Sequence, residues 1–205
     1  MSRVGAFFFD ADGVVQSTPA GFIDGLRALV PPSGRAAFLD AVFKAEEPCL
    51  RGEGDFAAAL GPVLRQWRVS RPLSRVLALW EEIRPAADVL DVVQELRRAG
   101  RPCYLATNQQ ALRAAHMRRR LGYDALFDAA FYSCDLGAAK PDASFFSAML
   151  ARVPHPAAEC LFIDDKKANT AAAAAQGLEA LRFDLGEYAR PGEELRAQLG
   201  LWTAG

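Results

Sequence analysis

Short apolar runs that end abruptly in polar residues recur along this chain. The clearest three cover residues 4–9, 102–106 and 160–163, and residues 179–183 form a weaker fourth. Continuous apolar runs of this length are typical of strands buried on both faces of a parallel sheet. The pattern therefore predicts a parallel sheet.

Helical patterns separate these candidate strands. Residues 89–96 carry apolar side chains at helical spacing, with Asp88 as a candidate N-cap and Gly100 as a stop signal. Asp142 is a second candidate N-cap, before an apolar stripe over residues 145–150. Residues 169–176 are nearly all alanine, which favours a helix that packs closely on a sheet. Alternating strands and helices predict an α/β fold, and we expect its first strand to be central.

The stretch from residue 17 to residue 84 breaks this alternation. It holds helical patterns over 22–30, 36–43, 56–67 and 73–83, and no convincing buried strand. A connection between a strand and a helix is normally far shorter than this stretch. We therefore predict a catalytic core from residues 1–16 and 85–205, with residues 17–84 inserted as a helical cap.

Composition narrows the class of protein. Half of the 205 residues are apolar (51%), and 24 Lys and Arg against 25 Asp and Glu give a net charge of −1. Such a chain lacks the basic field that non-specific nucleic-acid binding requires, and it carries no run long enough to span a membrane. The four cysteines are scattered, and the first apolar run is too short for a signal peptide. We expect a cytoplasmic protein with no nucleic-acid or membrane partner; the oligomeric state stays open.

Polar residues of a restricted kind follow the predicted strands. They are Asp10 and Asp12 after the first, Thr107 and Asn108 after the second, and Asp164 and Asp165 after the third, with Lys140 in a loop before a predicted helix. The carboxyl ends of parallel strands meet at one edge of the sheet, where ligands bind. Four converging carboxylates repel one another unless a cation joins them, and a set of oxygen ligands favours Mg²⁺.

At these residues the chain resembles the haloacid dehalogenase-like superfamily of phosphotransferases. The segment 10–15 has the DxDGxx form of the first motif, and Thr107 stands at the second. Lys140–Pro141 matches the third motif, and residues 162–169 match the fourth in its double-Asp form. The four motifs follow in order along the whole chain. The resemblance implies a Rossmann-like parallel sheet with an inserted all-helical cap of the C1 type.

The resemblance also implies a role for each residue. Asp10 is the expected nucleophile, which forms an aspartyl-phosphate, and Asp12 is the expected acid and base. Thr107, Asn108 and Lys140 are expected to bind phosphoryl oxygens. The expected Mg²⁺ ligands are Asp10, the main-chain carbonyl of Asp12, Asp165 and, directly or through water, Asp164. The predicted function is Mg²⁺-dependent hydrolysis of the phosphoric monoester of a small phosphorylated metabolite.

Other functions were weighed beside this prediction. A phosphomutase shares all four motifs and differs only in the acceptor of the phosphoryl group. A phospho-receiver domain or a non-catalytic binding protein belongs to another class. A dehalogenase is disfavoured because attack on carbon does not need the acid and base at Asp12.

The loop 51–54 is the one segment of the expected cap that suggests a contact with substrate.

Overall fold

Five parallel strands form the sheet at the centre of the computed structural model, which describes residues 4–200. Their order across the sheet is β5 (Ala129–Tyr132), β4 (Cys103–Thr107), β1 (Ala6–Phe9), β6 (Cys160–Asp164) and β7 (Glu179–Arg182). Phe8 on β1 lies opposite Tyr104 on β4 and Phe162 on β6. The α/β fold and the central position of the first strand are confirmed. The carboxyl ends of all five strands meet at one edge of the sheet.

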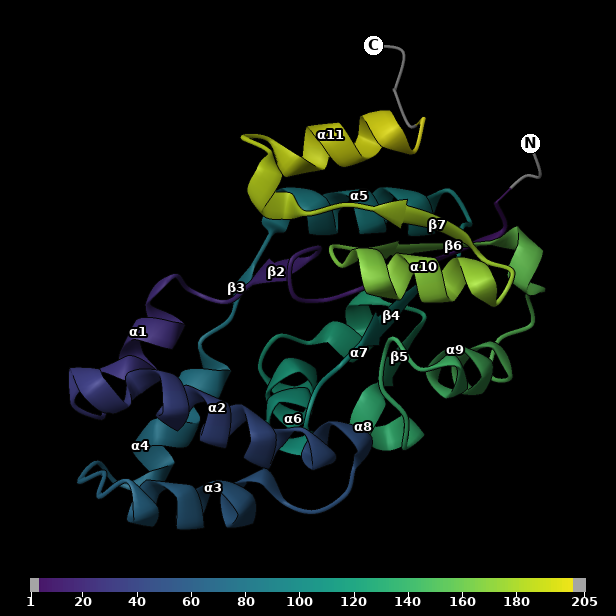
Figure 1. Cartoon of the computed structure of the whole chain (residues 1–205). Helices are drawn as coiled ribbons and strands as arrows, with labels where there is room; N and C mark the ends of the chain where they lie inside the picture. The colour runs from purple at the N-terminus through teal and green to yellow at the C-terminus, as the bar shows by residue number, and fades with distance from the viewer. Residues whose placement is uncertain (1–3, 201–205) are drawn as a thin grey trace.

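Helices cover both faces of the sheet (Figure 1). Phe7 and Phe9 point into a buried cluster with side chains of α5 (Ala87–Arg98), α6 (Ala111–Arg119), α7 (Tyr123–Leu126) and α11 (Pro191–Gln198). Phe8 points the other way, into a cluster with α9 (Ala143–Leu150) and α10 (Lys167–Ala175). The short helix α8 (Ser133–Leu136) follows β5. The sheet buries apolar side chains on both faces because β1 alternates between the two clusters.

The two predicted helix caps do not act as side-chain caps. Helix α5 begins at Ala87, and the carboxylate of Asp88 accepts a hydrogen bond from the Gly192 backbone N–H (2.8 Å) instead. Asp142 does hold the N-cap position of α9, but its side chain pairs with Arg51 Nη2 at 2.9 Å. In both cases the carboxylate that the sequence pattern predicted as a helix cap binds a residue distant in sequence instead.

Residues 21–81, called here the helical segment, pack around a third buried cluster of their own. Its helices are α1 (Gly21–Arg27), α2 (Arg35–Glu46), α3 (Phe56–Gln66) and α4 (Leu73–Leu77), joined by the 3₁₀ turns η1 (Pro32–Gly34), η2 (Pro48–Arg51) and η3 (Ala78–Glu81). Trp80 is buried in this cluster, with Phe22 and Phe56 packed edge-on against its ring. The helix predicted over residues 73–83 is shorter in the structure: α4 ends at Leu77, and the 3₁₀ turn η3 follows from Ala78.

Two very short strands join the helical segment to the rest of the chain. β2 (Gln16–Ser17) pairs antiparallel with β3 (Arg84–Pro85), so the chain leaves and re-enters the core at one place. The apolar pattern did not predict these strands because each has only two residues and β3 is exposed.

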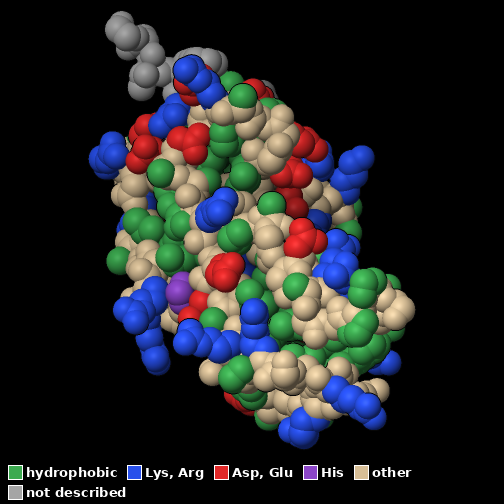
Figure 2. Space-filling view, turned by 90° about the vertical axis from the view of Figure 1, so that its left-hand side faces the viewer, with side chains coloured by type: hydrophobic (Ala, Val, Ile, Leu, Met, Phe, Trp, Pro, Cys, Tyr) green, Lys and Arg blue, Asp and Glu red, His purple; other side chains and the backbone are tan. Residues whose placement is uncertain are grey.

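The outer end of the helical segment is basic. No acidic residue occurs between Asp55 and Glu81, whereas Arg65, Arg68, Arg71 and Arg75 are all exposed there. Figure 2 shows acidic and basic side chains interspersed over the upper part of one face and basic ones gathered toward its lower end. Among residues 4–200, no helix combines the length and the apolar composition of a membrane span.

Candidate active site

The first strand delivers Asp10 to the carboxyl edge of the sheet. Asp10 is 5% exposed, and its Oδ1 accepts a hydrogen bond from the Ala11 backbone N–H at 2.7 Å. The chain then turns sharply at Gly13, whose φ is +85°. A Cβ at Gly13 would lie 2.7 Å from Asp165 Cγ. Only glycine allows the loop after β1 to pass so close to the Asp165 carboxylate.

Lys140 lies between two buried carboxylates. Its Nζ is 2.9 Å from Asp10 Oδ1 and 2.6 Å from Asp164 Oδ2, and it donates to the Ala106 carbonyl at 2.9 Å. Asn108 fixes the loop that carries Lys140: its Nδ2 donates to the Lys140 carbonyl (2.8 Å) and its Oδ1 accepts from the Lys140 N–H (2.9 Å). The side chain of Asn108 thus orients the lysine through its backbone.

Burial and charge act against each other in this group. Burial raises the pKa of Asp10 to about 7, because Lys140 offsets only part of the desolvation and Asp164 adds repulsion. Burial lowers the pKa of Lys140, but the attraction of Asp10 and Asp164 outweighs it and leaves that pKa above its ordinary value. Lys140 is therefore a buried cation, held charged by the two carboxylates that face it.

The two aspartates after β6 have different surroundings. Asp164 is fully buried, and its oxygens accept hydrogen bonds from the Lys166 backbone N–H (2.9 Å) and from Asn169 Nδ2 (2.9 and 3.0 Å). Asp165 is half-buried, and its Oδ1 is buried without a hydrogen-bond partner among the described residues. Burial raises the pKa of Asp165. Asp165 is the carboxylate of the pair with a free oxygen.

The carboxylates of Asp10, Asp164 and Asp165 form one cluster, in which the closest set of oxygens lies within 4.8 Å. All the ligand atoms are oxygens, the Asp165 Oδ1 has no partner, and the glycine at position 13 keeps side-chain atoms out of the space beside it. A small divalent cation that prefers oxygen ligands, such as Mg²⁺, fits this donor set.

Asp12 follows Asp10 by two residues, and its carboxylate contacts side chains from α6, from the turn before α6 and from β2. Its Oδ1 accepts from Arg113 Nη2 at 2.6 Å and from Gln16 Nε2 at 3.0 Å, and its Oδ2 accepts from Gln109 Nε2 at 2.8 Å. The same Gln109 donates to Thr107 Oγ1 (3.1 Å), which is buried at the end of β4. Three donors thus fix the orientation of the Asp12 carboxylate.

A pocket of about 310 Å³, called here the interface pocket, lies between the helical segment and the core. Its walls are formed by Asp12, Asn108, Gln109, Arg113 and Lys166 from the core and by Phe22, Phe43, Glu46, Leu50 and Trp80 from the helical segment. Asp12 connects this pocket to the carboxylate cluster. A ligand in the interface pocket would lie against Asp12.

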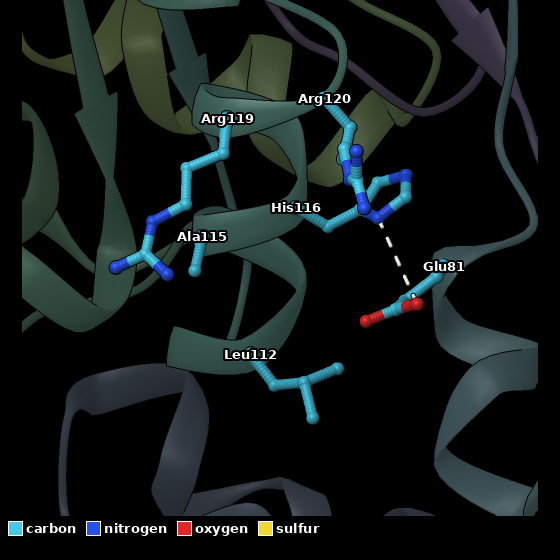
Figure 3. A pocket seen from close by; sticks show the side chains of 6 residues that line it. All are labelled: Glu81, Leu112, Ala115, His116, Arg119 and Arg120. Atoms are coloured by element: carbon cyan, nitrogen blue, oxygen red, sulfur yellow. Dashed lines mark ion pairs between the residues drawn. The ribbon is translucent and has the colours of Figure 1, made fainter.

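A second pocket, of about 410 Å³, lies between α6 and η3. Figure 3 shows His116 on α6 facing Glu81. Their Nδ1 and Oε2 atoms are 3.9 Å apart, and Arg119 and Arg120 also line this pocket. None of the residues predicted for catalysis lines this pocket. It is therefore separate from the carboxylate cluster.

The loop 51–54 does not line the interface pocket. Arg51 pairs with Asp142 on the core, and Gly52 lies so close to the Cys134 carbonyl that a Cβ there would collide with it. The expectation that this loop contacts substrate therefore finds no support: it docks the helical segment onto α8 and α9, and Leu50 just before it reaches the pocket.

The structure adds Gln109, Arg113 and Glu46 to the residues that the sequence singled out. Arg113 is 5% exposed and also donates to the Trp80 carbonyl (3.2 Å) and to Thr18 Oγ1 (3.4 Å). The sequence analysis did not single out Arg113; a charged residue just before Ala114 and four residues before Met117, both apolar, is the one sequence signal that could have found it. Glu46 gives no such signal, since its position depends on how the helical segment packs.

The sequence profile of the haloacid dehalogenase-like hydrolases matches residues 4–177. The chain therefore belongs to this family, and it is an enzyme of the hydrolase class.

The solved structures that resemble it agree in fold. A HAD family enzyme from Bacteroides thetaiotaomicron, crystallised with magnesium and inorganic phosphate, has a TM-score of 0.75 at 19% identity, covering 91% of this chain and 97% of that one. A predicted HAD-like family hydrolase from Porphyromonas gingivalis has a TM-score of 0.75 at 22% identity, with 96% and 99% covered. At these identities the likeness shows the fold alone.

One curated relative matches over a shorter stretch. The sesquiterpene phosphatase astK of Aspergillus oryzae is 39% identical over 69 residues, which are 33% of this chain and 35% of that protein. The match thus spans about a third of either protein.

Proposed function

We propose that this protein hydrolyses phosphate monoesters of small metabolites, with Mg²⁺, through a phosphorylated Asp10. The observation that carries the proposal is the position of Asp10 at the end of the central strand, 2.9 Å from the ammonium of Lys140 and within the cluster of Asp164 and Asp165. The positive charge of Lys140, and of a metal ion held by the carboxylate cluster, would offset the repulsion between the Asp10 carboxylate and a phosphate dianion. Membership of the hydrolase family supports it, as do the phosphatase activity in the curated relative's name and the magnesium and phosphate in the Bacteroides structure.

Asp10, Asp165 and the main-chain carbonyl of Asp12 would hold the Mg²⁺, with Asp164 beside them. When bound, the ion supplies positive charge that offsets the repulsion between the Asp10 carboxylate and the phosphate. Asp164 orients Lys140 in this arrangement, because its Oδ2 is 2.6 Å from Nζ. Thr107, whose Oγ1 accepts from Gln109, is in place at the end of β4 to donate its own hydroxyl to a phosphoryl oxygen.

In the first step Asp10 attacks phosphorus and the ester P–O bond breaks. Asp12 delivers a proton to the departing alcohol oxygen, and the alcohol leaves through the interface pocket that Asp12 lines. In the second step water attacks the phosphorus of the acyl phosphate, Asp12 takes the proton of that water, and the P–O bond to Asp10 breaks. Phosphate leaves, and both aspartates return to their starting states.

The helical segment acts as a cap in this proposal. It supplies five side chains of the interface pocket and is joined to the core only by the paired strands β2 and β3 along the chain. Arg51, Trp80 and Glu81 tie it to α9 and α6 of the core. Its walls would cover the leaving group and exclude bulk water from Asp12.

Phosphate release from a panel of phosphorylated metabolites tests the proposed function. We expect release with Mg²⁺, loss with EDTA, recovery when Mg²⁺ is restored, and no release by Asp10→Asn. Isomerised esters without release of phosphate would identify a phosphomutase instead. Stable phosphorylation without turnover would favour the receiver alternative, and restoration by Zn²⁺ but not Mg²⁺ would contradict the metal assignment.

A further inference from the structure

The interface pocket determines which alcohol the enzyme releases, if the proposed function is right. Asp12 protonates the leaving oxygen in that proposal, and Asp12 is one of the residues that line the pocket. The alcohol must therefore lie against the walls of the interface pocket. Its volume of about 310 Å³ is at the lower end of the range for small-molecule sites.

The wall formed by the helical segment is almost entirely apolar. Phe22 and Trp80 are buried, at 8% and 2% exposure, and Leu50 lies beside them in the lining. Phe43, which is 38% exposed, is the one large apolar residue exposed to solvent among residues 4–200. An exposed aromatic ring at the wall of a pocket gains by contact with an apolar ligand.

Glu46 is the single charged residue on that wall. It extends from the last turn of α2, and its Oε1 accepts a hydrogen bond from Trp80 Nε1 at 2.7 Å. Burial raises the pKa of Glu46 to about 7, so the carboxyl carries its negative charge above that pH. A second anionic group on the substrate would lie near this carboxyl and the surrounding aromatic rings.

Arg113 attracts the Glu46 carboxylate, but the effect of burial on that carboxyl is larger. Arg113 already pairs with Asp12 at 2.6 Å and donates to the Trp80 carbonyl. Lys166 is exposed on the core side of the pocket. Its positive charge attracts the carboxylate of the preceding residue, Asp165, and acts to lower the pKa of that group. The helical segment contributes no Lys or Arg to the lining.

We propose that the interface pocket selects phosphate monoesters of alcohols with an uncharged, largely apolar body, and that Glu46 is the residue that rejects esters with a second anionic group. This selectivity rests on the proposed function only because that function places the leaving alcohol in the pocket.

A matched pair of substrates tests this selection. Hexyl phosphate and 6-(phosphonooxy)hexanoate differ by one terminal carboxylate, far from the ester. In Mg²⁺ at about pH 8.5, where Glu46 is ionised, we expect kcat/KM to favour hexyl phosphate by about tenfold or more in the wild type, because one close pair of like charges is worth that much. Glu46→Lys should remove or reverse the preference, and Glu46→Gln, which still accepts from Trp80, should reduce it by raising kcat/KM for the acid.

Glu47→Lys is the matched control, because Glu47 is exposed one residue further on and does not line the pocket. It should leave the preference unchanged. Phe43→Ala should lower kcat/KM for hexyl phosphate several-fold and leave acetyl phosphate, which is too small to fill the pocket, unaffected. Equal kcat/KM for the matched pair in the wild type, or a change with Glu47→Lys as large as with Glu46→Lys, would overturn the inference. Failure to turn over acetyl phosphate at all would instead refute the proposed function.

Discussion

Arg113 Nη2 lies 2.6 Å from Asp12 Oδ1, and the same guanidinium donates to the Trp80 carbonyl of the helical segment. The acid and base proposed for the reaction is thus held by a residue that also contacts the proposed cap. The guanidinium is almost fully buried, whereas the Asp12 side chain is 39% exposed, so the position of the buried arginine sets the geometry of the pair. The position of the helical segment and the orientation of Asp12 are therefore linked through Arg113.

Replacing Arg113 should impair the step that needs Asp12. In Arg113→Met we expect kcat for alkyl phosphates to fall by about 10²-fold, since a misplaced acid and base loses much of its contribution. Acetyl phosphate, whose leaving group needs little protonation, should phosphorylate Asp10 at a rate much closer to that of the wild type. Steady-state assays with both substrates measure the difference. Arg119→Met, on the exposed face of the same helix, is the control; equal losses for both substrates in Arg113→Met would indicate a structural role only.

Lys140 should contribute to stability as well as to catalysis. Lys140→Met leaves Asp10 and Asp164 buried without their cation, and we expect the free energy of unfolding in EDTA to fall by about 3–5 kcal/mol. Urea denaturation followed by circular dichroism measures this. Adding Asp164→Asn to that variant should recover part of the loss, while exposed Lys167→Met should change it by less than about 0.5 kcal/mol. A loss below about 1 kcal/mol in Lys140→Met would contradict the geometry.

The apolar pattern of the sequence was enough to predict the strands of the sheet, but it did not predict how the helices begin. Buried strands such as β4 and β6 are uninterrupted apolar runs, so their pattern predicts them without knowledge of the rest of the chain. Asp88 and Asp142 carry equally typical capping patterns, yet Gly192 and Arg51 bind their carboxylates. Those partners lie far away in sequence, and no local pattern contains them.

Asp165 should dominate the binding of Mg²⁺. We expect saturating Mg²⁺ to raise the melting temperature of the wild type, because an ion at about 100 times its Kd adds about 2.7 kcal/mol to the folded state. Asp165→Asn should lose most of this increase in differential scanning fluorimetry. Asp40→Asn, an exposed carboxylate elsewhere on the chain, should retain it. An unchanged Mg²⁺ response in Asp165→Asn would show that the ion binds elsewhere.

Glu46 should make stability depend on pH. Its pKa rises from an ordinary 4.5 in the unfolded chain to about 7 in the folded protein, so the folded state binds more protons between these values. The free energy of unfolding therefore falls as pH rises through this window, and the contribution is lost above about pH 7. Relative to Glu46→Gln, the wild type should lose about 1–2 kcal/mol between pH 4.5 and 8, allowing for solvent at the partly exposed carboxyl. Parallel stability curves for the two proteins would contradict this.

Part of the candidate active site could be predicted from the sequence, and part could not. Asp10, Lys140, Asp164 and Asp165 follow strands or precede a helix, so their convergence at one sheet edge was predictable from their place in the pattern. The groups that surround Asp12 were not. Gln109 and Arg113 reach it from α6 and the turn before it, and Glu46 comes from the helical segment, whose packing against the core is a tertiary property.

The central claim is that Asp10 carries the phosphoryl group, and intact mass spectrometry after treatment with acetyl phosphate tests it most directly. In Asp12→Asn the nucleophile remains, but the base that activates water is lost, so the intermediate should accumulate. We predict that Asp12→Asn with Mg²⁺ gains the mass of one phosphoryl group, that peptide mapping after borohydride reduction places it at Asp10, and that Asp10→Asn gains nothing. A phosphoryl adduct on Asp10→Asn, or none on Asp12→Asn while acetyl phosphate is still consumed, would contradict the account.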